Sequence, residues 1–356
     1  MSSLSVFTVV FIGAGFAAAA IFAVKRMVGP RRMAALEHAL QSGNSKMLLR
    51  HAKTLLSRNE RNVDAHWYLG EAYRLEGKLE LAIVEYRYIT NSARFTAVAG
   101  EKKVREALAR SYLELGQLDE SQKEFILLSK MEPDNAEYLF QIARLFEERN
   151  YPDSAFNNYK KVLALNPKHG PSYLRMGVIF YNRKQFNEAK KALMAAVRLD
   201  PQNVSPHYYL GKMARAAGDA STALAHFEKA LRDPDLKQRA MYERGFILVT
   251  RGDLKQAIEE LEKAIALGEE NLAVALAIRH LLAQCYEATK DIVRAVEHWE
   301  KIYEKNPKYK DVAEKLATYG DLKADDTLKD FLIAPQQKFQ EYSTKIVESM
   351  GLAVQD

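Results

Sequence analysis

The chain has 356 residues, of which 48% are hydrophobic and 28% charged, a composition typical of a globular protein that excludes a disordered or fibrous one. Its single cysteine, Cys285, excludes a disulfide framework and a zinc site made of several thiolates. The net charge is +6, but four basic residues and no acid precede Met33, so the rest of the chain carries only +2. A surface this balanced lacks the basic footprint that phosphate backbones require, and we expect no nucleic-acid partner.

Residues 1–24 predict a transmembrane anchor, because they contain no charged side chain. As a helix, residues 4–24 would be roughly 31 Å long, enough to cross the hydrocarbon region. Lys25 and Arg26 follow directly; a cleaved secretory signal, the alternative, carries its charges before a shorter apolar run. The positive-inside rule then predicts a single-pass protein of the inner (cytoplasmic) membrane. We expect the body to face the cytoplasm, with a periplasm-facing body as the alternative.

The same segment contains small residues at Gly13, Gly15 and Ala18, the letters of a dinucleotide-binding loop. That loop functions only between a strand and a helix of an alternating fold, and helical repeats follow here, so we expect no cofactor. Gly13 and Ala17 lie four residues apart, which lets a second membrane helix approach closely and leaves self-association open.

The middle of the chain repeats itself, with four consecutive spacings of 34 residues. A small residue recurs at Gly70, Ala109, Ala143, Gly177, Gly211, Gly245 and Ala283. Twelve positions after each of these come Ala82, Ser121, Ala155, Ala189, Ala223, Ala257 and Ala295. Three positions after each come Tyr73, Tyr112, Phe146, Phe180, Ala214, Leu248 and Tyr286. Prolines close several units, at Pro133, Pro167, Pro201 and Pro307.

This pattern resembles the tetratricopeptide repeat (TPR) family over residues 64–307. The resemblance implies an all-α fold, a right-handed helical-repeat solenoid of about seven to eight repeats after the membrane helix. The small residue is needed where the paired helices cross, and the ring three positions later fills the wedge between neighbouring units. Residues 25–63 predict a basic junction and a degenerate capping pair of helices. The longer spacings predict insertions near residues 91–100 and 268–272.

Residues 308–356 lie beyond the regular register. We expect a capping helix over 309–318, a polar linker over 321–327 and an amphipathic helix over 335–350. The last segment resembles the opening of Mrr-type restriction-endonuclease-like domains but contains none of a nuclease's acidic or lysine centre. The alternative function is therefore a regulatory or anchoring part of a longer protein, with a nuclease-like catalytic domain beyond residue 356.

No catalytic pattern stands out elsewhere in the chain. The eight histidines form no H-E-x-x-H pair, and His280 and Cys285 lie five residues apart without a third ligand nearby in sequence. Cys285 follows the crossing position Ala283 by two residues, which favours a packed thiol over a nucleophile. We expect no catalytic residue, no metal site and no enzymatic activity.

TPR proteins bind partners in a concave groove lined by the first helix of each unit. The family's groove positions lie three residues before and one residue after the small residue. The candidate partner-binding residues are Trp67, Arg110, Phe140, Arg144, Leu174, Tyr208, Lys212, Arg215, Tyr242 and Phe246. Aromatic rings with basic residues suit a peptide or an amphipathic helix with apolar anchors and acids, and the lysine–asparagine clamp of chaperone-binding members is missing.

The open alternative is that neighbouring helices or the C-terminal tail cover some of these residues. If these residues bind a partner in the groove, truncating Tyr208 and Tyr242 together should abolish partner capture and leave the fold intact.

An anchor, a basic junction and a repeat array together are similar to the lipopolysaccharide assembly protein B family, without that family's rubredoxin-like metal domain. Spirochaete flagellar collar proteins offer a second resemblance. Both imply a membrane-tethered, non-enzymatic scaffold in a bacterial envelope or flagellar-motor assembly process.

Overall fold

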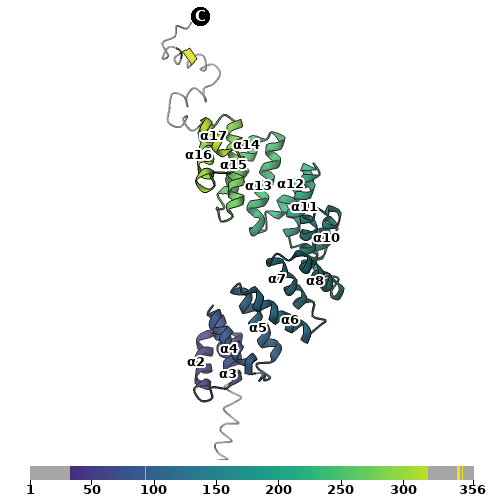
Figure 1. Cartoon of the computed structure of the whole chain (residues 1–356), viewed down its shortest axis with the longest axis vertical. Helices are drawn as coiled ribbons and strands as arrows, with labels where there is room; N and C mark the ends of the chain where they lie inside the picture. Colours follow the sequence, from purple (N-terminus) through teal and green to yellow (C-terminus); the bar gives the residue numbers. More distant parts are fainter. Residues whose placement is uncertain (1–32, 93, 320–342, 345–346, 348–356) are drawn as a thin grey trace, which may run out of the picture. The chain divides into compact units, whose positions relative to one another are not determined.

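The computed structural model describes residues 33–92, 94–319, 343–344 and 347, and within these residues every regular element is a helix (Figure 1). The predicted anchor at 1–24 and the linker at 321–327 lie outside the described residues. Of the predicted helix at 335–350, only residues 343, 344 and 347 are described, and they are helical. None of the helices in the described part is long and apolar enough to cross a bilayer.

Helices follow one another in antiparallel pairs along the chain. Their bounds are α2 Ser45–Leu56, α3 Val63–Leu75, α4 Leu79–Ser92, α5 Glu101–Glu114, α6 Leu118–Met131, α7 Ala136–Glu148, α8 Pro152–Leu165, α9 Gly170–Asn182, α10 Phe186–Leu199, α11 Ser205–Ala216, α12 Ala220–Ala230, α13 Pro234–Arg251, α14 Leu254–Ile265, α15 Leu272–Ala288, α16 Ile292–Lys305 and α17 Val312–Tyr319. The seven predicted units are confirmed as repeats one to seven, from α3–α4 to α15–α16. A helical stretch over residues 33–41 and α2 lie where the sequence predicts a capping pair of helices.

The final capping helix starts later than the sequence pattern predicts. It begins at Val312 rather than at residue 309, because Lys310 has a φ of 46°, which a right-handed helix cannot contain. Tyr309 and Asp311 therefore lie in a turn between α16 and α17.

The paired helices cross at the predicted small residues. A Cβ on Gly70 would lie only 2.5 Å from Cε1 of Tyr86, and one on Gly245 only 2.6 Å from Cδ2 of Leu261. In every repeat the residue sixteen positions after the small one is buried in the second helix. These residues are Tyr86, Phe125, Tyr159, Leu193, Phe227, Leu261 and Trp299. The crossing glycines and alanines thus let a large side chain of the partner helix fill the centre of each pair.

The turn that connects the two helices of each pair contains a residue in the left-handed conformation, seven positions after the crossing residue. Gly77, Gly116, Gly218 and Gly252 supply it in four repeats, with φ between 71° and 83°. Asn150, Lys184 and Lys290 adopt the same conformation in the other three, with φ of 61°, 60° and 68°. The turn geometry is therefore a property of the repeat and does not depend on glycine.

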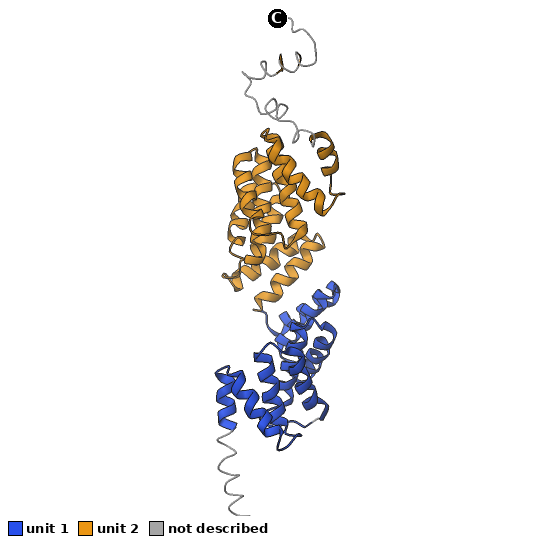
Figure 2. Ribbon diagram, turned by 90° about the vertical axis from the view of Figure 1, so that its left-hand side faces the viewer, with its two compact units in different colours: residues 1–167 blue, residues 168–356 orange. Residues whose placement is uncertain are grey.

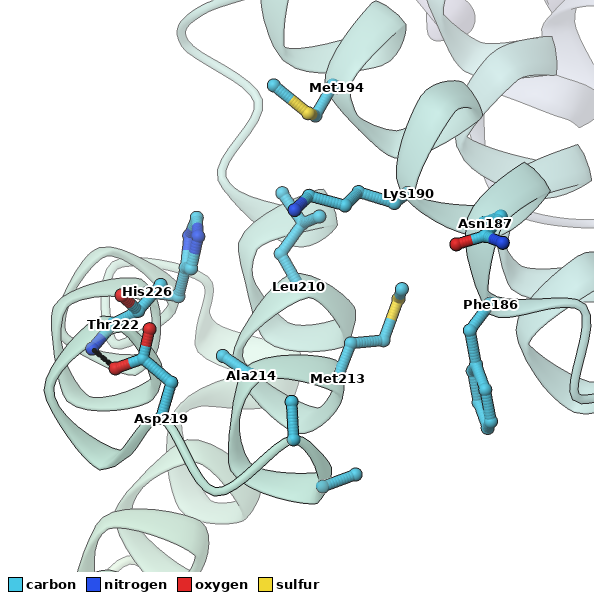
Figure 3. Close-up of a pocket in the computed structure, with 12 residues that line it drawn as sticks. Phe186, Asn187, Lys190, Met194, Leu210, Met213, Ala214, Asp219, Thr222 and His226 are labelled. Carbon is cyan, nitrogen blue, oxygen red and sulfur yellow. Dashed lines mark hydrogen bonds between the residues drawn. The ribbon is translucent and has the colours of Figure 1, made fainter.

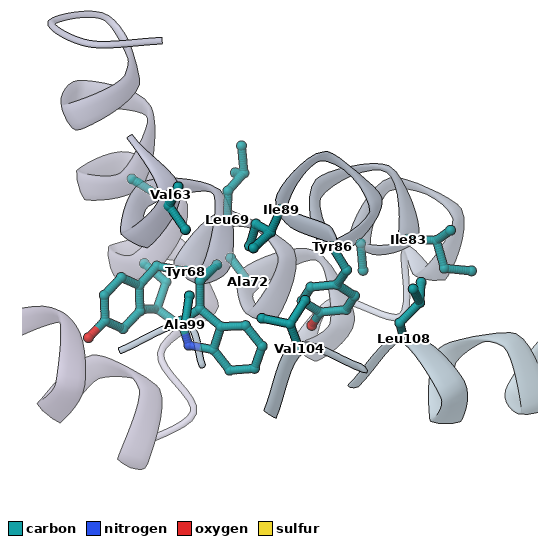
Figure 4. Packing of buried hydrophobic residues seen from close by; sticks show 14 of the residues in the cluster. Val63, Tyr68, Leu69, Ala72, Ile83, Tyr86, Ile89, Ala99, Val104 and Leu108 are labelled. Carbon is teal, nitrogen blue, oxygen red and sulfur yellow. The ribbon is translucent and has the colours of Figure 1, made fainter. Parts of the chain in front are cut away.

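The chain forms two compact units, residues 1–167 and 168–356 (Figure 2). In unit 1, Tyr68, Tyr86 and Val104 share a core in which the predicted insertion takes part (Figure 4). Ala99 of that insertion is buried, and Thr96 accepts a hydrogen bond from the Ala99 amide and donates one to Asp64. In unit 2, the largest cluster surrounds Leu261, Leu282 and Trp299.

Candidate protein-binding surfaces

In unit 1, the two aromatic candidates for the groove are mainly packing residues. Trp67 is 2% exposed, its ring lies 5.6 Å from that of Tyr86, and the Lys103 ammonium sits 4.7 Å from its centre. Phe140 is 9% exposed and lies 5.8 Å from the ring of Tyr159. Both rings therefore stabilise the repeat and offer a partner only an edge.

The two arginine candidates of unit 1 are more accessible. Arg110 on α5 is exposed, and Arg144 on α7 forms a 3.3 Å ion pair with Glu148 one turn further along. An exposed pair of this spacing contributes only about 0.3–0.5 kcal/mol, so Arg144 can exchange Glu148 for an acid of a partner at little cost.

In unit 2, the candidates come together on α11. Lys212 lies one residue after the crossing position, and its ammonium is 5.6 Å from the ring centre of Tyr208 and 5.3 Å from that of Tyr181 on α9. Tyr208 is 7% exposed and packs against Phe227 at 6.0 Å. Lys212 thus carries a positive charge over two aromatic faces, an attraction worth about 0.5–1 kcal/mol or more per pair.

A second cluster joins α11 to α13. The Arg215 guanidinium is 4.7 Å from the ring centre of Phe246, and its Nη1 lies 3.0 Å from Oε2 of Glu243. Glu243 is 4% exposed, and burial raises the pKa of its carboxyl, although Arg215 and Lys212 act in the opposite direction. Phe246 is 38% exposed, which leaves its outer ring edge open to a partner. Glu243 holds Arg215 in place beneath that ring.

The remaining candidates of unit 2 are half-buried. Leu174 on α9 and Tyr242 on α13 keep part of their surface accessible, and burial raises the pKa of the Tyr242 hydroxyl. We call Tyr181, Leu174, Tyr208, Lys212, Arg215, Tyr242 and Phe246 the first-helix face of unit 2.

The α16–α17 turn covers the corresponding position of repeat seven. His280 is buried at 4% exposure, its Nε2 lies 2.8 Å from Oδ1 of Asp311, and its ring meets that of Tyr309 at 5.8 Å. Burial lowers the pKa of His280, while Asp311 opposes that shift. Part of the sequence-predicted groove is therefore closed by the chain itself.

Three features of this region were missed at the sequence level. Tyr181 lies four residues after Gly177, the same repeat position that the candidate Arg215 occupies after Gly211, and this equivalence was the signal in the sequence. Glu243, which pairs with Arg215, directly follows the groove candidate Tyr242, and this adjacency was its signal in the sequence. The closure by Tyr309 and Asp311 left no sequence signal, because it depends on how the turn after α16 folds back.

The described residues show no alternative chemistry at these surfaces. No three His, Cys, Asp or Glu side chains in that part of the chain lie close enough together to hold a metal ion. Cys285 is buried, as its position predicts, and burial raises the pKa of its thiol to about 11, so the nucleophilic thiolate is suppressed.

Direct comparison establishes the family. A tetratricopeptide repeat family model matches residues 49–93, 106–170, 211–272 and 242–310, together more than half of the chain. A second model of the same description matches residues 146–212. The chain belongs to the tetratricopeptide repeat family. Scaffolds of this family typically bind proteins or peptides and are not enzymes, and both matching models describe repeats rather than catalytic domains.

Curated relatives align with parts of the chain. BBSome complex member BBS4 of Bos taurus is 25% identical over 162 residues, 46% of this chain and 31% of that protein. TPR repeat-containing protein MJ1428 of Methanocaldococcus jannaschii is 23% identical over 209 residues, 53% of this chain and 36% of that protein. The chain therefore spans about a third of the length of these two relatives.

Solved structures share the fold. PilF of Pseudomonas aeruginosa has a TM-score of 0.54 at 19% identity and covers 61% of this chain and 97% of its own. A chain of the APC/C hetero-tetramer Cut9–Hcn1 has a TM-score of 0.55 at 16% identity and covers 80% of this chain and 55% of its own. At these identities the likeness concerns the helical repeat alone.

Proposed function

We propose that the protein is a membrane-tethered, non-enzymatic scaffold that binds a partner segment on the first-helix face of unit 2. The observation that carries this proposal is the stack of Lys212 over Tyr181 and Tyr208 beside the Arg215–Phe246 pair. Rings combined with cations are typical of binding hot spots, and Glu243 neutralises only one of the two cations. The face therefore suits an amphipathic helix that carries apolar anchors and acids.

The cellular setting is part of the same proposal. The uncharged run at 4–24, followed by Lys25 and Arg26, supports a single-pass anchor with the repeats on the cytoplasmic side of the inner membrane. The similarity of the architecture to bacterial membrane-anchored repeat scaffolds supports a role in envelope or flagellar-motor assembly. The alternative, a regulatory part of a longer protein with a nuclease-like domain, is distinguished by the length of the natural open reading frame.

Site-specific crosslinking in cells tests the partner surface. A photo-crosslinking amino acid at Phe246 should capture a defined protein, and Lys212→Glu should remove that product by reversing the charge over the two rings. The matched control places the crosslinker at Lys255, which is exposed on α14. A product from position 255 that equals that from position 246, or one that Lys212→Glu leaves unchanged, contradicts the proposal.

Cysteine labelling tests the orientation. Ser45→Cys places a thiol at the start of α2, near the proposed membrane junction, and the buried Cys285 gives little background. An impermeant maleimide should label this variant only after the inner membrane is opened. Labelling in intact spheroplasts would place the repeats on the periplasmic side.

A further inference from the structure

Unit 2 contains a cavity on the opposite side of α11 from the first-helix face. It has a volume of about 480 Å³ and lies between α10 and α12, with α11 as its floor (Figure 3). That volume falls within the roughly 300–1,000 Å³ typical of ligand pockets. Its walls include Phe186, Met194, Leu210, Met213, Ala214 and His226. Positions 210, 213, 214 and 217 follow helical spacing, and positions 208, 212 and 215 occupy the other side of the same helix.

One position that lines the cavity distinguishes repeat five from the other repeats. Three residues after the crossing position, five of the other six repeats carry an aromatic ring and repeat six carries Leu248. Repeat five carries Ala214. Repeats five and six therefore both lack the ring, and only repeat five has no large side chain at this position.

Repeat seven shows what the same position contains when it is filled. The ring of Tyr286 stacks on His298 at 5.7 Å and 14°, and its hydroxyl donates a 2.8 Å hydrogen bond to Glu262 of the preceding second helix. His298 follows Ala295 by three residues, as His226 follows Ala223. Repeat five thus presents the stacking histidine without the ring.

Repeat six contains the equivalent pocket, of about 400 Å³, but charged side chains line it. Arg244 reaches across it and pairs with Glu228 on α12 and with Glu260 on α14, the latter at 3.2 Å. One period earlier, the positions of these three residues are occupied by Leu210, Met194 and His226. Repeat five therefore has neither the ring nor the ion bridge, and its walls are mainly apolar.

The rim of the cavity favours an acidic ligand. Lys190 lines it and is exposed, and Lys229 and Lys190 both act electrostatically on His226. Asp219 also lines the cavity, but its carboxylate is engaged at the start of α12, where it accepts a 3.0 Å hydrogen bond from the Thr222 amide.

We propose that this cavity binds an aromatic side chain from an acidic segment of a partner protein, with the ring against His226 and a carboxylate near Lys190. The internal template for the ring is Tyr286 on His298, and the methionines give the walls the adaptability that recognition surfaces use. The inference goes beyond the proposed function, because it gives unit 2 a second docking site on the other side of α11.

Methyl NMR of the full chain in detergent micelles tests the site with defined peptide probes. Ac-Asp-Asp-Tyr-Asp-Asp-NH2 should shift the methyl signals of Met194 and Met213 in a saturable way. Replacing the tyrosine of the peptide by alanine, or its acids by lysines, should weaken binding roughly tenfold or more. Equal binding of all three peptides, or unchanged Met194 and Met213 signals, overturns the proposal.

Ala214→Tyr is the decisive variant, because it supplies the missing ring from the chain itself. We expect it to raise the thermal midpoint and to abolish peptide binding. A lower thermal midpoint would show that the walls leave no room for a ring and would overturn the proposal. Met194→Lys, at a side chain that is 50% exposed, should fold normally and bind the peptide roughly tenfold more weakly; unchanged binding would overturn the proposal. Lys255→Glu on α14 is the matched control and should bind as the wild type does.

One further outcome identifies another occupant. If wild type is a dimer in sedimentation and Ala214→Tyr is a monomer, the occupant is a second copy of this chain and the proposed partner is wrong. The crosslink from position 246 should persist in Ala214→Tyr, because that variant fills only the cavity. Failure of the cavity proposal can therefore be distinguished from failure of the proposal that a partner binds the first-helix face.

Discussion

Gly177 of α9 lies so close to Leu193 of α10 that a Cβ on residue 177 would sit 2.7 Å from Leu193 Cγ and 3.3 Å from its backbone nitrogen. The backbone nitrogen cannot move without shifting the helix, so a larger side chain must separate the pair. We predict that Gly177→Leu lowers the free energy of unfolding by about 1–3 kcal/mol or more. Urea denaturation measures the loss. Because each repeat contacts mainly its neighbours, hydrogen exchange should increase around α9 and α10 first.

Gly170→Ala is the matched control on the same helix. A Cβ there would lie 3.5 Å from Leu199 Cβ, an ordinary van der Waals contact. The control should leave the stability unchanged or raise it slightly, because alanine has the better helix propensity. Equal losses for the two variants would contradict the assignment of Gly177 as the crossing residue.

The left-handed turn residues give a second prediction. Lys184 has a φ of 60°, a conformation that costs an L side chain about 1–2 kcal/mol. Lys184→Gly removes this cost but increases the freedom of the unfolded chain, so we expect a net gain of about 0.5–1 kcal/mol in urea denaturation. Gly218→Ala, at the equivalent position of repeat five with φ 78°, should have the opposite sign. Two changes of the same sign would be inconsistent with this account.

Acid should weaken repeat five through a pair of histidines. The Nδ1 atoms of His207 and His226 are 2.9 Å apart, so one ring donates and the other accepts while both are neutral. Burial first, then His226 and Lys229, lower the pKa of His207 to about 4, and burial followed by Lys229 and Lys190 lowers that of His226. The unfolded chain takes up these protons near pH 6.5, whereas the folded chain protonates His207 only near pH 4 and His226 only below its ordinary pKa. Stability therefore falls as the pH decreases from 6.5 to 4.

His207→Gln tests this pH dependence, since glutamine cannot titrate. The free energies of unfolding from urea denaturation at pH 7 and pH 4.5 should differ less in the variant than in the wild type, by on the order of 1–3 kcal/mol. Burial also lowers the pKa of His280 and His298, so a smaller acid loss should remain. An unchanged difference between the two pH values would show that the histidine pair is not responsible.

Because Tyr208 is buried, truncating Tyr208 and Tyr242 together would also destabilise the fold, contrary to the expectation from the sequence. Because its ring packs on Phe227, Tyr208→Ala should lower the free energy of unfolding by about 3–5 kcal/mol. Phe246→Ala, at a ring that is 38% exposed, should change stability by less than about 1 kcal/mol and still reduce partner crosslinking. If Tyr208→Ala proves neutral, the ring is a surface residue and the double truncation becomes a valid test again.

The sequence alone determined the helical repeat, because crossing two helices closely needs a small residue and burying them needs a large one at a fixed distance. Gly70, Gly177 and their equivalents therefore predicted seven helix pairs, the longer spacings between them predicted both insertions, and the position two residues after Ala283 predicted the buried Cys285. Local spacing contains this information, since each contact lies within one pair or between successive ones.

Only the tertiary structure decided which of these side chains remain accessible. Trp67 and Tyr208 occupy groove positions but are buried by rings of their paired helices, and Asp311 folds back over His280 from a turn with no repeat signal. The cavity beside Ala214 likewise depends on three helices at once. The sequence shows that a ring is absent there, but burial and open space are set by the atoms that neighbouring elements bring to the same place.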